Sequence, residues 1–110
     1  MTNLEELMVL SPRVQAERLA AALTRKGFIA MQLTTADHDR HPCVQLTWSP
    51  AIGKTAHAYI YVAEDEDGVW WFFWDTMEAI IPAAYVHAAA EQITAEINLR
   101  KLRLFPVRAV

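Results

Sequence analysis

The spacing of hydrophobic residues changes twice along the chain, from helical to alternating and back to helical. Between Pro12 and Lys26 the apolar residues recur every three or four positions, as they do on one face of an α-helix. Ser11 is a favoured N-cap ahead of proline at the first helical position, and Gly27 is a natural stop. We therefore predict a helix over Pro12–Lys26, preceded by a short helix from Thr2 to about Leu10.

Four segments of strand composition follow this helix. In each of them successive side chains would point to opposite faces of a sheet. The predicted strands are Phe28–Thr35, Cys43–Trp48, His57–Ala63 and Val69–Trp74. Polar turns separate them, and Asp67-Gly68 is a typical hairpin sequence before the fourth strand. Strands joined by such short turns predict an antiparallel meander.

The fourth predicted strand, Val69–Trp74, consists of six large apolar residues, five of them aromatic. A half-exposed strand alternates apolar with polar residues, but this one is apolar on both faces, so both faces need cover. Helices can pack on one face, and the other face needs a further layer, a partner chain or a ligand. We expect a partner or self-association in preference to full internal burial.

A long C-terminal helix is predicted after a short linker that follows Asp75, with Pro82 as its first residue. Val86, Ile93 and Ile97 then lie on one side of the helix and can pack across a sheet face. The 110 residues, 54% of them hydrophobic, suit one α+β domain over 1–110. The predicted architecture is a two-layer sandwich of N-terminal helices, a four-stranded antiparallel meander and the long C-terminal helix.

Composition narrows the choice of compartment and partner. A net charge of −3 gives no general attraction to nucleic acid or to an anionic membrane. The single cysteine, Cys43, cannot form an internal disulfide, which suits a reducing cytoplasm. The first residues lack the basic start of a secretory signal, and no apolar run approaches the roughly 18 residues of a membrane helix. We expect a cytoplasmic protein without a cofactor.

One cluster of metal-binding residue types occurs near the first hairpin. His38, His41 and Cys43 lie within a short segment and are competent zinc ligands. A structural zinc site normally takes paired ligands from two segments, and the sequence has no second cluster of this kind. The solvated-turn interpretation is therefore favoured over a metal site.

No catalytic residue is assigned from the sequence. His57 shares a predicted strand face with Tyr59 and Tyr61, but acid–base chemistry needs a positioned partner and a cleft, which spacing does not show. Cys43 lacks the surroundings of a known nucleophile motif. Gly53-Lys54-Thr55 lacks the earlier glycine of a phosphate-binding loop and leads into a strand instead of a helix.

Two segments support a coarse resemblance to known proteins, Gly68–Trp74 and Pro82–Ile97. Their layout resembles the secretion-chaperone-like folds of small bacterial binding proteins. It is also similar to small actinobacterial proteins in which a tryptophan-rich strand leads to an alanine-rich helix. The first resemblance implies a homodimer that binds another protein, and it assigns no functional residue.

The predicted function is that of a non-enzymatic binding or accessory protein. It would self-associate, as a homodimer, or bind a small protein partner through an aromatic sheet face. The predicted contact residues are Trp48, Tyr59, Tyr61, Trp70, Trp71, Phe73 and Trp74. The alternative is a small apolar-ligand-binding protein or enzyme whose pocket is lined by the aromatic strand. An enclosed pocket at Trp70–Trp74 favours the alternative, and a flat patch favours a protein partner.

Overall fold

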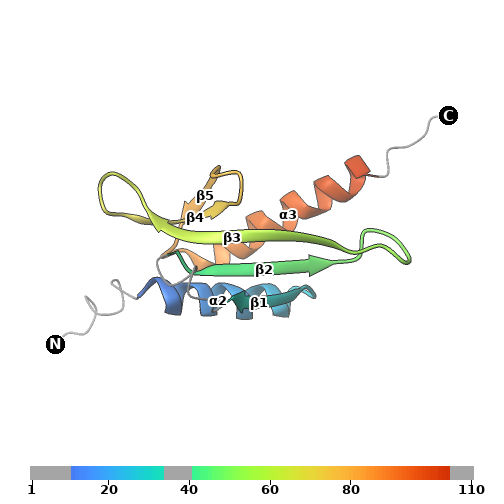
Figure 1. Ribbon diagram of the computed structural model, residues 1–110, viewed down its shortest axis with the longest axis horizontal. Coiled ribbons are helices and arrows are strands. Elements are labelled where there is room, and N and C mark those ends of the chain that lie inside the picture. The colour runs from blue at the N-terminus through green and yellow to red at the C-terminus, as the bar shows by residue number, and fades with distance from the viewer. Residues whose placement is uncertain (1–10, 34–40, 105–110) are drawn as a thin grey trace.

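The computed structural model describes residues 11–33 and 41–104, with side chains described up to Leu99. These residues form an α+β fold of two helices and five strands (Figure 1). The elements are α2 (Pro12–Arg25), β1 (Ile29–Leu33), β2 (Cys43–Trp48), β3 (Ala56–Glu64), β4 (Trp70–Trp74), β5 (Ala79–Pro82) and α3 (Val86–Leu104). The strands are ordered β1-β2-β3-β4-β5, and each pairs antiparallel with the next. The predicted antiparallel meander and C-terminal helix are confirmed.

Local signals place both ends of α2. At its start the Ser11 hydroxyl accepts a hydrogen bond from the Val14 N–H at 3.2 Å. At its end Gly27 adopts a φ of 100°, a left-handed conformation that costs glycine little. The Phe28 N–H then donates to the Leu23 carbonyl at 3.2 Å, the pattern of a Schellman cap. This cap brings Phe28 beside Leu23, and both side chains are buried in the core.

The prediction of four strands is corrected by β5. We expected a linker after Asp75 and a helix from Pro82, but Ala79–Pro82 forms a fifth strand paired with β4. A tight turn reverses the chain directly after β4: the Met77 N–H donates to the Trp74 carbonyl at 2.8 Å. Pro82 has no N–H to give to a ladder, and it lies at the end of an edge strand, where proline is tolerated. The helix therefore begins four residues later, at Val86.

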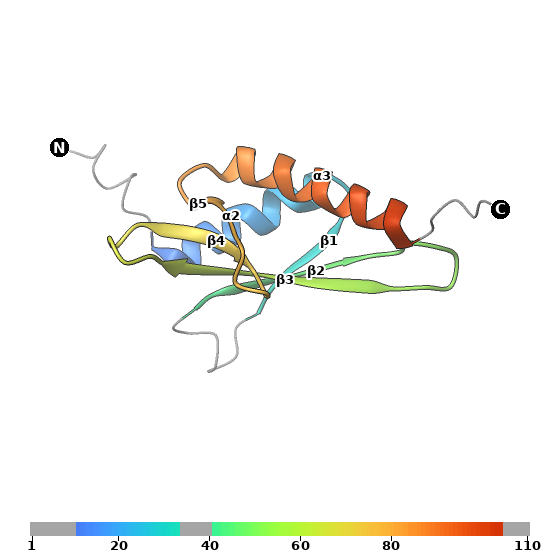
Figure 2. The ribbon, with the colours of Figure 1, turned by 90° about the horizontal axis from the view of Figure 1, so that it is seen from above.

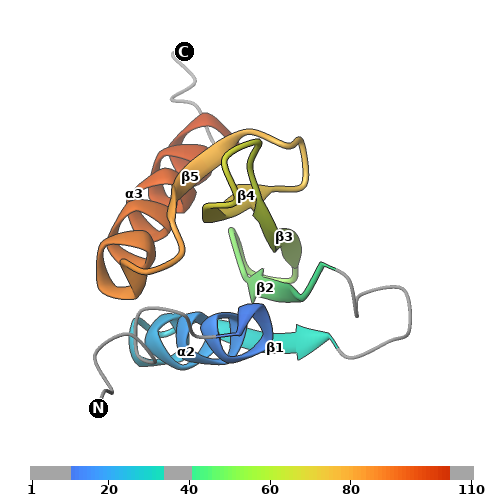
Figure 3. The same cartoon turned by 90° about the vertical axis from the view of Figure 1, so that its left-hand side faces the viewer.

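Both helices pack against the same face of the twisted sheet (Figures 2 and 3). Val86, Ile93 and Ile97 of α3 are buried there, as their spacing predicted. The largest fully buried side chains on this face come from both helices and the three central strands: Leu19, Leu23, Val44, Leu46, Ile60, Val62, Phe72, Ile93 and Ile97. Cys43 is also fully buried but lies on the other face. The hydrophobic core cluster thus lies on the helix side of the sheet. Within residues 11–33 and 41–104, no helix covers the other side.

The short helix expected from Thr2 to about Leu10 lies outside the described residues. None of the described helices is both long and apolar enough to cross a membrane.

Candidate functional site: the open face of the sheet

The strand register defines a second sheet face that points away from the helices. Paired residues of neighbouring strands share a face, so each cross-strand row can be followed from one strand to the next. Ile29, for example, pairs with Thr47, which pairs in turn with His57. We call this face the open face. Its members are Ile29, Met31, Leu33, Cys43, Gln45, Thr47, His57, Tyr59, Tyr61, Ala63, Trp71, Phe73, Ala79 and Pro82.

The open face has large apolar side chains but no ionised acid or base of the Asp, Glu, Lys or Arg type. Ile29 and Met31 at its β1 edge are 65% and 54% exposed. Tyr59, Trp71 and Phe73 are partly buried and extend the apolar surface across β3 and β4. The centres of protein interfaces are likewise depleted in charge and enriched in aromatic residues and methionine. The open face therefore has the composition of a contact surface.

Polar side chains on the open face hydrogen-bond to one another across the strands. The Gln45 Nε2 donates to the Tyr59 hydroxyl at 3.2 Å. The Thr47 hydroxyl and the Nδ1 of His57 lie 3.1 Å apart. A polar group costs less to bury when it already has a partner. These two pairs lower the cost of covering the face with an apolar surface.

An acidic side chain holds one rim of the open face in place. In the β3–β4 hairpin, the Asp65 carboxylate accepts hydrogen bonds from the N–H groups of Val69 at 3.0 Å and Asp67 at 2.8 Å. It also accepts from the Trp71 indole at 2.9 Å, which orients that ring. These bonds, that of Val69 first, hold the pKa of Asp65 below its usual value. Gly68 closes the turn with a φ of 81°, in agreement with the predicted Asp-Gly hairpin.

The lowered pKa of Asp65 predicts a specific loss of stability in acid. Because the ionised form is favoured in the folded state, its contribution is fully present above the ordinary pKa of 3.8. It is lost as the pH falls through the lower folded-state value. We expect Asp65→Asn to remove this part of the acid dependence of the melting temperature, whereas Asp67→Asn should leave it in place. Thermal unfolding at several pH values below 5 measures the melting temperatures of both variants. If the melting temperature of Asp65→Asn depends on pH as steeply as that of the wild type, the proposed role of the Asp65 carboxylate is wrong.

Cys43 and Tyr61 lie side by side on the open face and are both neutral at pH 7. Cys43 is fully buried, and burial raises the pKa of its thiol to about 11, against a smaller opposing effect of the hydrogen bond with Tyr61. The pKa of Tyr61 is also raised, first by burial and then by its proximity to Cys43. A nucleophilic cysteine needs the thiolate, which this environment disfavours. Partly buried Tyr61 thus adds to the uncharged surface, while Cys43 is buried and does not form a reactive site.

The structure divides the predicted contact residues between the two faces. Tyr59, Tyr61, Trp71 and Phe73 belong to the open face. The other three, Trp48, Trp70 and Trp74, point toward the helices; Trp48 and Trp74 are core residues, 9% and 5% exposed, and Trp70 packs against that core. They lie on the opposite side of the sheet from the other four because residues of one strand alternate between faces.

The predicted contact set omitted two exposed members of the open face. Ile29 and Met31 are the most exposed large apolar residues on this side of the sheet. The alternation within Phe28–Thr35 already grouped them on one strand face. The predicted contact set consists of aromatic residues only, and neither Ile29 nor Met31 is aromatic.

The remaining candidates do not assemble into a site. His41 is exposed, whereas Cys43 is fully buried on the open-face side of the sheet. His38 lies outside the described residues. Within the described part of the chain, no three His, Cys, Asp or Glu side chains are placed to hold a metal ion. Three cavities formed by described residues lie near the helices and the end of β2, and none is lined by Trp70–Trp74.

Comparison with known proteins leaves the open face as the main guide to function. No protein-family model matches the chain, and neither a curated protein nor a solved structure matches it.

Proposed function

We propose that this protein is a non-enzymatic binding module that self-associates through the open face, with a second copy of the chain as the partner. One observation supports the proposal most directly. The open face extends over all five strands, includes exposed Ile29 and Met31, and has no Asp, Glu, Lys or Arg side chain. Apolar surface of this extent on one side of a small domain is a recognised mark of a binding site.

The uncharged character of the face favours a second copy as its partner. In a two-fold symmetric dimer the same patch meets itself, so a charged side chain near the axis would meet its own like charge. The open face has no such side chain. The resemblance to secretion-chaperone-like folds, which implies a homodimer, supports the same partner.

The exposed residues at β1 supply much of the expected binding energy. Full burial of an isoleucine or methionine side chain contributes about 1.5–3 kcal/mol relative to full exposure. Ile29 and Met31 have 65% and 54% of their surface left to bury. Each can therefore add on the order of 1–2 kcal/mol to the free energy of association.

The alternatives have less support. A small apolar ligand would need a pocket at the aromatic strand, and the three described cavities have no lining residue from it. A different small protein partner would use the same surface but would not require its self-complementarity. The proposal places the dimer in the cytoplasm, because the one cysteine of the chain is a buried free thiol.

A charge placed on the open face tests the proposal. We expect Met31→Glu to raise the dimer dissociation constant at least tenfold, because a symmetric interface would then bury two carboxylates near one another. Light scattering or sedimentation over a concentration series measures this constant. Leu99→Glu is the matched control: Leu99 is 48% exposed and lies on α3, away from the open face.

Two results would contradict the proposal. The first is a wild-type protein that stays monomeric at the highest concentration measured. The second is an equal effect of Met31→Glu and Leu99→Glu on the dimer dissociation constant. That result would mean that association does not depend on the open face.

A further inference from the structure

β1 forms one edge of the sheet, and no strand of the described chain pairs with its outer side (Figure 3). Edge strands expose backbone N–H and C=O groups to other chains, so proteins usually protect them with charged residues, proline or a bulge. β1 has no charged residue and no proline, and its register with β2 is regular over all five residues. Its Ile29 and Met31 side chains are also exposed. β1 is therefore an edge without these protective features.

The opposite edge of the sheet, β5, has the protection that β1 lacks. It is only four residues long and ends in Pro82, which has no N–H to donate. A register shift between Phe72 and Phe73 also interrupts its ladder with β4. Because the two edges differ in this way, pairing with a further strand is favoured at β1 and not at β5.

The hydrogen-bond pattern of the sheet identifies the backbone groups of β1 that point outward. The Val62 N–H donates to the Pro42 carbonyl at 2.9 Å, which continues the β2–β3 ladder by one pair. Along a strand within an antiparallel sheet, successive residues direct their N–H and C=O groups to opposite neighbours. By this rule Met31 bonds to β2. The backbone groups of Ala30 and Gln32, on either side of Met31, consequently point outward.

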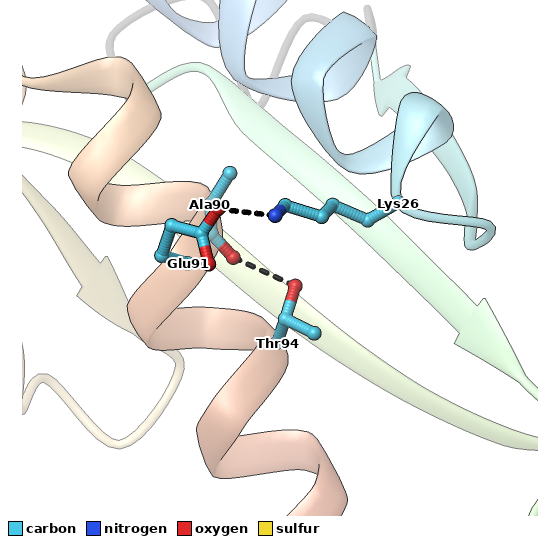
Figure 4. A network of polar contacts seen from close by, with 4 residues as sticks. All are labelled: Lys26, Ala90, Glu91 and Thr94. Atoms are coloured by element: carbon cyan, nitrogen blue, oxygen red, sulfur yellow. Dashed lines mark hydrogen bonds and ion pairs between the residues drawn. The ribbon is translucent and has the colours of Figure 1, made fainter.

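Contacts with the helices hold β1 at both ends. Just before the strand, the Lys26 ammonium group pairs with the Glu91 carboxylate on α3 (Figure 4). Near the end of the strand, the Gln32 Nε2 donates to the Arg13 carbonyl of α2 at 3.3 Å. An edge that is already ordered loses less conformational freedom when another strand pairs with it.

We propose that β1 pairs antiparallel with β1 of a second copy, so that the two sheets join into one. Two-fold pairing centred on Met31 places Ala30 opposite the partner's Gln32, and Gln32 opposite the partner's Ala30. Their outward groups then form about four backbone hydrogen bonds in total. In the same register Met31 meets the partner's Met31, and Ile29 meets the partner's Leu33.

The chemistry of β1 favours a second copy as the partner. The alternating N–H and C=O groups of a sheet edge are matched by another extended strand. Since β1 has no charged residue, no like charges meet when the strand pairs with its own copy. Each apolar side chain on the open-face side of β1 then meets another apolar side chain. The inference does not rest on contact between open faces, because it uses backbone groups of the sheet edge.

Amide hydrogen exchange of the ¹⁵N-labelled full chain, measured by NMR at low and high protein concentration, tests the proposal. We expect the amides of Ala30 and Gln32 to exchange at least tenfold more slowly at high concentration, because pairing gives them acceptors. The Met31 amide, which is bonded to β2, should exchange slowly at both concentrations. Contact through the open face alone would give the Ala30 and Gln32 amides no new acceptor, so the experiment separates the two contacts.

Ala30→Pro and Ala30→Gly form a matched pair of variants. Ala30→Pro removes an outward N–H and keeps the hydrogen bonds between β1 and β2, so the Gln32 amide should no longer exchange more slowly at high concentration. Ala30→Gly keeps the N–H, and its Gln32 amide should behave as in the wild type. The melting temperature of each variant shows whether it is folded, and the wild-type exchange decides the question if Ala30→Pro does not fold.

Three results would overturn the edge pairing. The first is association of the wild type, seen by light scattering, while the Ala30 and Gln32 amides exchange equally fast at both concentrations; the open-face contact would then stand. The second is a chain that stays monomeric at the highest concentration, which would also overturn the proposed function. The third is equal slowing of the Gln32 amide in folded Ala30→Pro and Ala30→Gly.

Discussion

Phe72→Ala is expected to lower the free energy of unfolding by about 3–5 kcal/mol, whereas Phe73→Ala should cost less than half of this. The two residues are neighbours on β4 and have the same side chain. Phe72 points toward the helices and is 0% exposed in the core. Phe73 belongs to the open face and is only partly buried. The comparison therefore isolates the effect of the sheet face from that of the residue type.

The loss in Phe72→Ala arises from the apolar contacts removed and from the cavity left between sheet and helices. Phe72 pairs with Val62 on β3 and with Ile81 on β5, so its ring lies among residues that also support the core. Interiors packed at this density relax only in part when a large side chain is removed. A loss of this size is a large fraction of the stability of a small domain.

Urea denaturation of both variants at low protein concentration measures the difference. Low concentration matters because dimerisation through the open face would add to the apparent stability of the wild type and not to that of Phe73→Ala. Equal losses in the two variants would mean that both faces of β4 are core. That result would contradict the open face as well as the prediction.

Cys43 is expected to react with iodoacetamide at least about 100-fold more slowly in the folded protein than in the urea-unfolded chain. Alkylation requires the thiolate. Burial raises the pKa of the Cys43 thiol from 9.0 to about 11, which lowers the thiolate fraction near neutral pH by two powers of ten. The complete burial of the side chain adds a steric barrier to this effect.

The rate is measured by mass spectrometry at one pH in the presence and absence of urea. A control variant joins Cys43→Ala with Ile52→Cys, which moves the only thiol to a fully exposed loop position. This control should react at similar rates in both conditions. Fast alkylation of Cys43 in the folded protein would contradict its placement within the sheet.

The raised pKa of the Cys43 thiol also affects the stability of the fold at high pH. The pKa of Cys43 is higher in the folded than in the unfolded state, so burial of the neutral thiol adds stability that is fully present below pH 9.0. This contribution is lost as the pH rises toward about 11. Cys43→Ala should remove that part of the dependence of the free energy of unfolding on alkaline pH.

Elements that depend on neighbours along the chain could be predicted from the sequence. Ser11-Pro12 and Gly27 place the ends of α2, because capping involves only groups within one turn of the helix. The alternation of Cys43–Trp48 predicts β2 with the same bounds as the structure. The spacing of Val86, Ile93 and Ile97 likewise identifies the buried side of α3.

The fifth strand depends on more than local pattern. Ala79–Pro82 is short and ends in proline, which on its own suggests the start of a helix. Pairing with β4 decides in favour of a strand, because the Asp75–Glu78 turn brings the segment beside a strand edge that has free hydrogen-bonding groups. The sequence contains the turn, but the gain from pairing exists only once the sheet has formed.

Strand β4, with its five aromatic residues, shows most clearly what cannot be predicted from the sequence alone. Its alternation assigns Trp70, Phe72 and Trp74 to one face and Trp71 and Phe73 to the other, and both sets are equally apolar. Only the packing of α2 and α3 decides which set is core. The cavity lined by Lys26, Trp48 and Thr94, among others, has the same origin, because its lining residues come from four separate parts of the chain. The periodicity of the helices and strands and the turns between the first four strands are local properties, so they can be predicted from the sequence. Tertiary structure decided which face is covered, because burial is a property of the assembled layers.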